Sequence, residues 1–297
     1  MVKLNLNNVD SGELKYEVFK FPDGQQDLKI ILKNMITPKS VIIESRFNNF
    51  TDLELILCAT KALRNMGFKE ITLWVPYLLG SRSDRLFEYG GTSYLRDIIA
   101  PILNAQNYEK VISYDVHSDV AEACINNFKS INSNSMVLNY IDNFLPNKEI
   151  TLVSPDAGSL KKVWSLLKYL KDCDAMVSDD IIIASKHRDV KTGNITHTNV
   201  PLNNGEHTNN VFLIFDDICD GGRTFIEIAK VIKNIRPNSE LYLGVTHGIF
   251  SKGLDELKEY FNGVFSTNSY STKENDGFLR QYDVFNHPIL TSKNFVK

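Results

Sequence analysis

Cysteine is scarce in this sequence, and long apolar runs are missing. The cysteines lack the C-x-x-C spacing of zinc sites and the pattern of a secreted disulfide framework. There are four of them, Cys58, Cys124, Cys173 and Cys219. No apolar run approaches the roughly 20 residues of a membrane-spanning helix, and the first residues, MVKLNLNNVDSGELKYEV, lack the apolar centre of a signal peptide. We therefore expect a cytoplasmic protein with no membrane partner.

An excess of charge of one sign is also absent. Lys and Arg number 33 against 36 Asp and Glu, which gives a formal net charge of −3. Because no basic field covers the chain, we expect no nucleic-acid partner, and local groups must hold any anionic ligand. With 297 residues, 43% of them hydrophobic, the chain is long enough for two compact domains and too apolar to be disordered.

What the sequence does contain is an alternation of short β-branched runs with longer helical stretches. SVIIE at residues 40–44 and ITLWVP at residues 71–76 are typical of buried strands. Between them, Thr51-x-x-Glu54 is a capping-box pattern that predicts the start of a helix ending at Gly67. The second half of the chain repeats this rhythm. The alternation predicts an α/β fold with mainly parallel sheets flanked by helices.

The middle of the chain holds the expected domain boundary. A helix is predicted over residues 94–106, and the run KVISYD that follows at 110–115 is typical of a strand. The polar stretch NNFKSINSNS and the segment NFLPNKE then separate the two halves. We place the boundary near residue 147, which gives domains 1–147 and 148–297.

The sharpest local signal follows the apolar run Val211–Phe215. The segment Asp216-Asp217-Ile218-Cys219-Asp220-Gly221-Gly222-Arg223-Thr224 leads from this run into an amphipathic helix. Glycines let backbone amides approach a phosphate closely, and the N-terminus of the helix adds a positive dipole end. The acids suit ribose hydroxyls or metal-bound water, so a phosphorylated sugar satisfies both ends. Taken alone, the segment also fits a solvated turn whose glycines serve tight packing.

Polar residues follow other predicted strands as well. The segments Val111–Asp119 and Thr151–Ser159 each contain a strand that ends in an acid, and Thr246–Ser251 is a further strand end. In open parallel sheets ligands gather outside the carboxyl ends of the strands. These segments are therefore the candidates for a binding site.

Taken in order, these blocks resemble the ribose-phosphate pyrophosphokinases over most of the chain. The matching blocks are Phe21-Pro-Asp-Gly24, Pro76-Tyr77, Ser81-Arg82-Ser83-Asp84, Asp115-Val-His117, Ser154-Pro-Asp156-Ala-Gly158, Lys186-His-Arg188, Asp216–Thr224, Thr246–Ser251 and Thr267-Asn268. The resemblance implies two phosphoribosyltransferase-like α/β halves, with ATP bound in the first and ribose 5-phosphate in the loop of the second. It implies transfer of the β,γ-diphosphate of ATP to the sugar, with release of AMP.

The resemblance also implies roles for particular residues. Those expected to bind ATP are Phe21, Asp23, Gln25, Arg82, Ser83, Asp84 and His117. Those expected to bind the ribose phosphate are Asp216, Asp217, Asp220, Gly221, Gly222, Arg223 and Thr224. His117 and Asp156 would sit at the Mg²⁺–ATP site, and the cations Lys186 and Arg188 would stabilise the transferring group. Phe21, Asp23 and Gln25 match a segment that reaches the adenine of a neighbouring subunit, which implies a homo-oligomer, a dimer or a hexamer.

Two residues of the phosphate loop depart from the family pattern, Asp-Asp-x-x-Asp-Thr-Gly/Cys-Gly-Thr. Gly221 stands in place of Thr, and Arg223 stands in place of Gly. An arginine adds a bidentate ligand that could reach a second phosphate. Two further interpretations therefore stay open beside ribose 5-phosphate as acceptor: a 5′-extended acceptor such as ADP-ribose, which would fit NAD salvage, and a non-catalytic subunit. Retention of the acids and loop cations speaks against the non-catalytic subunit.

Overall fold

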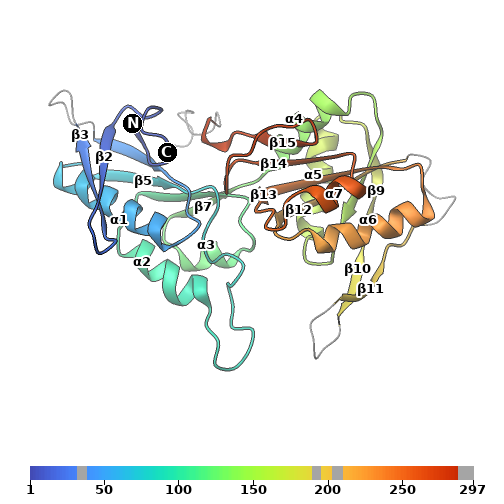
Figure 1. The fold of residues 1–297 in the computed structure, drawn as a ribbon, viewed down its shortest axis with the longest axis horizontal. Helices are drawn as coiled ribbons and strands as arrows, with labels where there is room; N and C mark the ends of the chain where they lie inside the picture. Colours follow the sequence, from blue (N-terminus) through green and yellow to red (C-terminus); the bar gives the residue numbers. More distant parts are fainter. Residues whose placement is uncertain (32–38, 189–194, 203–209, 287–297) are drawn as a thin grey trace. The chain divides into compact units, whose positions relative to one another are not determined.

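The chain folds into two compact units, each built on a parallel sheet. The computed structural model describes residues 1–31, 39–188, 195–202 and 210–286. One unit contains Met1–Asn132 together with Phe285 and Asn286, and the other contains Ser133–Val284. Figure 1 shows the helices of each unit lying against its sheet. No helix in the described segments has the length and apolarity needed to cross a membrane.

The first unit has a five-stranded parallel sheet in the order β1-β4-β5-β6-β7. Its strands are β1 (Val2–Asn5), β4 (Ser40–Glu44), β5 (Glu70–Trp74), β6 (Lys110–Tyr114) and β7 (Phe128–Ile131). An antiparallel hairpin, β2 (Lys15–Lys20) and β3 (Gln26–Ile31), follows β1. The helices are α1 (Phe50–Asn65), the π-helical turn η1 (Leu95–Ile99), α2 (Ala100–Asn104) and α3 (Val120–Cys124).

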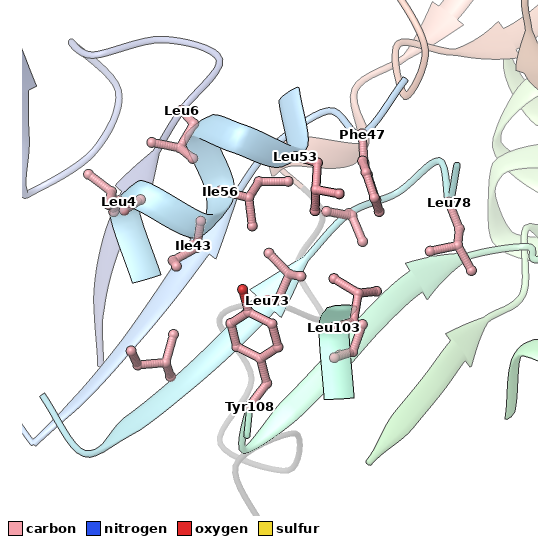
Figure 2. Packing of buried hydrophobic residues seen from close by; sticks show 14 of the residues in the cluster. Leu4, Leu6, Ile43, Phe47, Leu53, Ile56, Leu73, Leu78, Leu103 and Tyr108 are labelled. Carbon is pink, nitrogen blue, oxygen red and sulfur yellow. The ribbon is translucent and has the colours of Figure 1, made fainter. Parts of the chain in front are cut away.

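Apolar side chains fill the space between this sheet and its helices (Figure 2). Ile43 and Leu73 project from neighbouring strands toward Ile56 of α1, and all three are fully buried. A polar contact lies within this core, because the hydroxyls of Thr60 and Tyr108 are 2.7 Å apart. Burial raises the pKa of Tyr108 to about 12, so its hydroxyl stays protonated in this contact.

Two helix starts differ from the sequence-based expectation. Asn49, not Thr51, caps α1, because its side chain accepts a hydrogen bond from the Asp52 amide at 3.0 Å. The helix expected over residues 94–106 begins as a π-helical turn, in which the Ala100 amide bonds to the Leu95 carbonyl five residues earlier. Pro101 follows directly and has no amide to continue the regular α-helical ladder.

The second unit has a six-stranded parallel sheet in the order β15-β14-β13-β12-β8-β9. Its strands are β8 (Ile150–Ser154), β9 (Val177–Ile183), β12 (Val211–Cys219), β13 (Glu240–Gly248), β14 (Gly263–Thr267) and β15 (Leu279–Tyr282). An antiparallel hairpin of β10 (Ser185–Arg188) and β11 (Ile195–Asn199) projects from this unit (Figure 1). The helices are α4 (Asn134–Phe144), α5 (Leu160–Asp172), α6 (Arg223–Ile235) and α7 (Asp255–Tyr260), and the short 3-10 helix η2 covers Val284–Asn286.

Successive residues of the central strands face opposite sides of this sheet, as strand geometry requires. On β12, Phe212 and Ile214 pack in the cluster that contains the α6 and α7 side chains, whereas Leu213 and Phe215 pack with α4 and α5. Both strand faces are therefore covered, which explains the continuous apolar runs in the sequence. The expected architecture, two domains with mainly parallel sheets flanked by helices, is confirmed.

The division of the chain lies earlier than the expected boundary near residue 147. The segment interpreted as a polar linker forms β7 and then α4. Along the chain, the first unit ends at Asn132 and the second begins at Ser133. Helix α4 belongs to the second unit because Met136, Val137 and Tyr140 are buried against that unit's sheet. The apolar face of this helix was hidden among the asparagines and serines around it.

Candidate active site

The order of strands in the second unit marks a ligand-binding position. From the neighbouring strands β8 and β12 the chain proceeds outward in opposite directions, to β9 on one side and to β13, β14 and β15 on the other. Such a reversal opens a crevice at the carboxyl ends of the two strands, where open α/β sheets bind their ligands. Asp156 follows β8, and Asp216 and Asp217 lie near the carboxyl end of β12. The reversal therefore places three expected site residues around one crevice.

Ser159 connects the two sides of this crevice. Its hydroxyl donates to Asp216 Oδ1 at 2.9 Å and lies 3.3 Å from Asp156 Oδ1. Its amide donates to the same Asp156 oxygen at 3.1 Å. The carboxyl groups after β8 and on β12 are thus held in a fixed relation by one short side chain.

Asp216 and Asp217 differ in their electrostatic surroundings. Burial, reinforced by the neighbouring charge of Asp217, raises the pKa of Asp216 to about 8. The Asp216 carboxyl therefore holds a proton at neutral pH in the ligand-free protein. Asp217 is 5% exposed and has a cationic neighbour, since Lys162 Nζ on α5 lies 4.0 Å from its Oδ2. A carboxyl group that favours its neutral form thus stands beside one that has a lysine ammonium nearby.

The loop after β12 leads directly into α6. Gly222 is the N-terminal cap of this helix, and its φ of +80° is the left-handed conformation that glycine adopts without strain. No side chain caps the helix. The first turn, with Thr224 half-buried and Arg223 exposed, therefore offers backbone amides and a positive dipole end to an anion.

The strand end of β13 supports this loop. The Ser251 hydroxyl donates to Asp220 Oδ1 at 2.6 Å, and the Ser251 amide donates to the Asp220 carbonyl at 3.1 Å. Lys252 lies over Gly221, because a Cβ placed on that glycine would stand 3.4 Å from the lysine Cδ. The loop thus carries a lysine beside Gly221 and an arginine at position 223, both exposed.

In the first unit, Asp84 is the centre of a second polar cluster. It is 3% exposed and accepts hydrogen bonds from the Ser118 hydroxyl and from Arg85 Nε, the latter at 3.2 Å. Burial alone would raise the pKa of Asp84, but these two hydrogen bonds and the nearby charges of Arg85 and His117 lower it below its ordinary value. The structure therefore brings His117, at the end of β6, close to Asp84.

The other residues of this cluster have different degrees of exposure. Arg82 and His117 are exposed, and Ser83 is half-buried with its carbonyl bonded to the Leu95 amide at 3.0 Å. Asp115, just before His117, is buried with a φ of +48°, an uncommon conformation for a residue other than glycine. This turn lets β6 end in an exposed imidazole. An arginine and an imidazole thus lie exposed at the carboxyl end of this sheet.

Phe21, Asp23 and Gln25 form the turn of the β2–β3 hairpin. Asp23 Oδ1 accepts the Gln25 amide at 3.1 Å, and the Phe21 amide donates to the Gln25 carbonyl at 2.8 Å. All three residues are exposed. Their expected contact with the adenine of a neighbouring subunit stays a prediction.

The predicted catalytic cations lie on the hairpin of the second unit. Lys186 and Arg188 belong to β10, where they pair in register with Thr198 and Ile195 of β11. The side chains of Lys186 and Arg188 lie outside the described part of the structure. Their catalytic role stays a prediction.

The two predicted magnesium ligands differ in the chemistry of their donor atoms. A carboxylate such as Asp156 is the hard oxygen ligand that Mg²⁺ prefers, and an imidazole such as His117 is not. Within the described residues, no group of three or more acidic, histidine or cysteine side chains could enclose a metal ion. One carboxylate is nevertheless enough for an ion that arrives with phosphate oxygens and water. Asp156 fits this role.

Four residues of the crevice received no role in the sequence analysis, although two of them, Ser159 and Ser251, end candidate segments. They are Ser159, Lys162, Ser251 and Lys252. Each follows the carboxyl end of β8 or β13, so proximity to those strand ends was a signal that could have found them. Serine and lysine on a surface are common, and only the three-dimensional contacts separate these four from the rest.

Comparison with known proteins agrees with this geometry. A family model described as the phosphoribosyl transferase domain matches residues 126–282. Ribose-phosphate pyrophosphokinase of Pyrococcus abyssi is 25% identical over 88% of this chain and 86% of its own, and that of Pyrococcus furiosus is 23% identical over 86% of each.

A solved structure shows the same fold over nearly the whole chain. The phosphoribosylpyrophosphate synthetase of Mycobacterium smegmatis superimposes with a TM-score of 0.73, at 16% identity, over 95% of this chain and 89% of that one. The chain belongs to the phosphoribosyl transferase domain family and, within it, to the ribose-phosphate pyrophosphokinases, which are transferases.

Proposed function

We propose that this protein transfers the β,γ-diphosphate of ATP to the anomeric hydroxyl of ribose 5-phosphate. The products are phosphoribosyl pyrophosphate and AMP. The observation that carries the proposal is the arrangement at the carboxyl ends of β8 and β12. There, paired carboxyl groups lie in the same part of the sheet as helix α6, whose N-cap is a glycine. The names of the curated relatives support the same reaction.

The acceptor would bind with its two polar ends at opposite ends of the loop. Asp216 and Asp217 would hydrogen-bond the ribose hydroxyls, with the neutral carboxyl of Asp216 able to donate as well as accept. The 5′-phosphate would take the amides at the start of α6, beside Gly222. This pose fixes the ring at both ends and leaves the anomeric hydroxyl to face the nucleotide.

The chemistry then needs alignment and charge stabilisation. The anomeric oxygen attacks the β-phosphorus of ATP and loses its proton, and the bond from that phosphorus to the oxygen bridging it to the α-phosphorus breaks. AMP leaves with the bridging oxygen. Lys186 and Arg188 would stabilise the charge that develops on the transferring group, and Arg82 and His117 would hold the nucleotide phosphates. Magnesium held by Asp156 would neutralise phosphate charge.

A kinetic experiment tests this assignment. Purified protein with ATP, Mg²⁺ and ribose 5-phosphate should form AMP at a rate that depends on the sugar. The Lys186→Ala variant should lose about 10²-fold or more in kcat with little change in the KM for ATP, because a cation that serves the transition state acts on turnover. Lys168→Ala, an exposed lysine on α5, is the matched control. Equal loss in kcat and in ATP binding would contradict the role given to Lys186.

A second acceptor deserves testing because of the charges on the phosphate loop. Arg223 and Lys252 both lie beside the start of α6, and ribose 5-phosphate offers one phosphate for these two cations. A 5′-extended acceptor such as ADP-ribose carries two. If Arg223 binds the second phosphate, Arg223→Gly should lower kcat/KM for ADP-ribose about tenfold or more and spare ribose 5-phosphate. An unchanged ratio between the two acceptors would eliminate the extended acceptor.

The β2–β3 hairpin supports a homo-oligomer as part of the same proposal. Val18, Phe19 and Phe21 are 44%, 46% and 49% exposed, so this one hairpin carries three exposed apolar side chains. Exposed apolar groups of this kind mark contact surfaces. Sedimentation of the wild type should show an oligomer that the double variant Phe19→Ser, Phe21→Ser weakens. A monomeric wild type would contradict this assembly.

A further inference from the structure

The second unit contains a cavity that shares no residue with the candidate active site. It has a volume of about 180 Å³ and lies between α4, β14, β15 and the segment before β15. Tyr140 and Phe144 of α4 and Phe265 of β14 form its aromatic wall. A cavity of order 150 Å³ is large enough for one six-membered ring. Its size therefore suits a small ligand with a single ring.

The cationic side chain of Arg280 lines this cavity. The Arg280 guanidinium carbon lies 3.8 Å from the centre of the Phe144 ring, so the planar group is stacked on the aromatic face. Among the described residues, no carboxylate forms an ion pair with Arg280. Stacking leaves the in-plane N–H groups of a guanidinium available, and these groups bind a carboxylate in a bidentate manner.

The aromatic wall adds a second unused polar group. Tyr140 is 6% exposed, and its ring stacks on Phe265 with the centroids 4.0 Å apart. In the described part of the chain, its hydroxyl forms no hydrogen bond. This hydroxyl keeps some contact with solvent, and it can donate or accept a hydrogen bond.

The remaining wall is held rigidly. Gln281 Nε2 donates to the carbonyls of Thr267 and Ser271 at 3.0 and 3.1 Å, and its Oε1 accepts the Lys273 amide at 2.7 Å. These bonds tie the segment before β15 to β14. The cavity therefore has a fixed shape in the absence of ligand, which favours binding because little ordering is required.

We propose that this cavity is a binding site for a single-ring aromatic carboxylate. The ring would lie against Tyr140 and Phe265, and the carboxylate would take the in-plane donors of Arg280. The site is independent of the proposed transferase reaction, since it lies on other elements and uses other residues.

Titration calorimetry with four probes tests the proposal on the wild-type protein. Benzoate supplies ring and charge, cyclohexanecarboxylate supplies charge without planarity, benzyl alcohol supplies the ring without charge, and inorganic phosphate supplies charge alone. Benzoate should bind with a dissociation constant of about 1 mM or tighter, and each other probe at least about tenfold more weakly. Absence of saturable benzoate binding by about 10 mM, or equal binding of phosphate, would overturn the proposal.

Variants locate the bound benzoate. Arg280→Met keeps the stem that packs near Phe144 and removes the charge, and it should weaken benzoate binding at least about tenfold. Arg223→Gln removes an exposed arginine from the same unit, at the start of α6, and should leave benzoate binding unchanged. The reverse pattern would place benzoate in the active site and refute the proposal. Thermal unfolding of both variants checks that they are folded.

Discussion

Removal of the Ser159 hydroxyl tests whether the crevice in the second unit is a working site. In Ser159→Ala the backbone amide still donates to Asp156 Oδ1, at 3.1 Å in the wild type. What disappears is the donor that lies 2.9 Å from Asp216 Oδ1, which leaves that oxygen with the Asp217 amide alone. The change therefore affects the position of Asp216 much more than that of Asp156.

The magnitude follows from the kind of bond that is lost. Leaving a buried acceptor without one of its donors costs about 1–3 kcal/mol, and 1.4 kcal/mol corresponds to a factor of ten. Because Asp216 is assigned to the sugar, we expect kcat/KM for ribose 5-phosphate to fall about 10-fold to 100-fold, mainly through KM. The KM for ATP should stay close to the wild-type value.

The assay is the initial rate of AMP formation with each substrate varied in turn. Ser159→Thr keeps a hydroxyl at the same position, and its activity should recover relative to the alanine variant. Wild-type kinetics in Ser159→Ala would refute the positioning of Asp216 by this serine. An equal rise of both KM values would assign Ser159 to the structure of the whole crevice.

Three further changes test other parts of the account. Gly222→Ala places a side chain at a φ of +80° and should lower the free energy of unfolding in urea by about 1–2 kcal/mol. An unchanged urea midpoint would show that alanine adopts this conformation without strain. Because the folded pKa of Asp216 is raised to about 8, the folded state holds an extra proton between about pH 4 and pH 8, and stability should fall as pH rises through that window by up to about 1.4 kcal/mol per pH unit. Asp216→Asn should flatten this slope in metal-free buffer, and an identical slope would show that another group titrates. Lys3→Met should cost about 3 kcal/mol of stability, because it leaves the fully buried Glu44 carboxylate without the ammonium 2.9 Å away; a loss under about 1 kcal/mol would show that the charge is compensated elsewhere.

The strands were the most predictable part of the fold. SVIIE at residues 40–44 is β4 without any shift, and Val211–Phe215 begins β12, because strands covered on both faces read as continuous apolar runs. Helix α4 was missed since its buried side chains are spaced among asparagines and serines. The domain boundary was displaced for the same reason. The polar residues around α4 outweigh its apolar residues in the sequence, so its buried face is recognised only from the packing in the structure.

The candidate site was predictable as a set of strand ends, but its internal contacts were not. Asp156 and Asp216 were both selected from the sequence, yet 60 positions separate them along the chain, and the serine that joins them has no motif of its own. Lys252 is a similar case, since its position over Gly221 depends on how β13 turns after Gly248. Contacts between strand ends depend on the order of strands in the sheet, which a linear pattern does not contain.

The identity of the nucleotide product is the most direct test of the central claim. Phosphorus NMR of a reaction containing ATP, Mg²⁺, ribose 5-phosphate and the wild-type protein should show AMP together with a new diphosphate ester on the sugar, in equal amounts. This result requires that the bond between the α- and β-phosphates is the one that breaks. Formation of ADP and a sugar monophosphate ester would contradict the account, because it would mean transfer of the γ-phosphate alone.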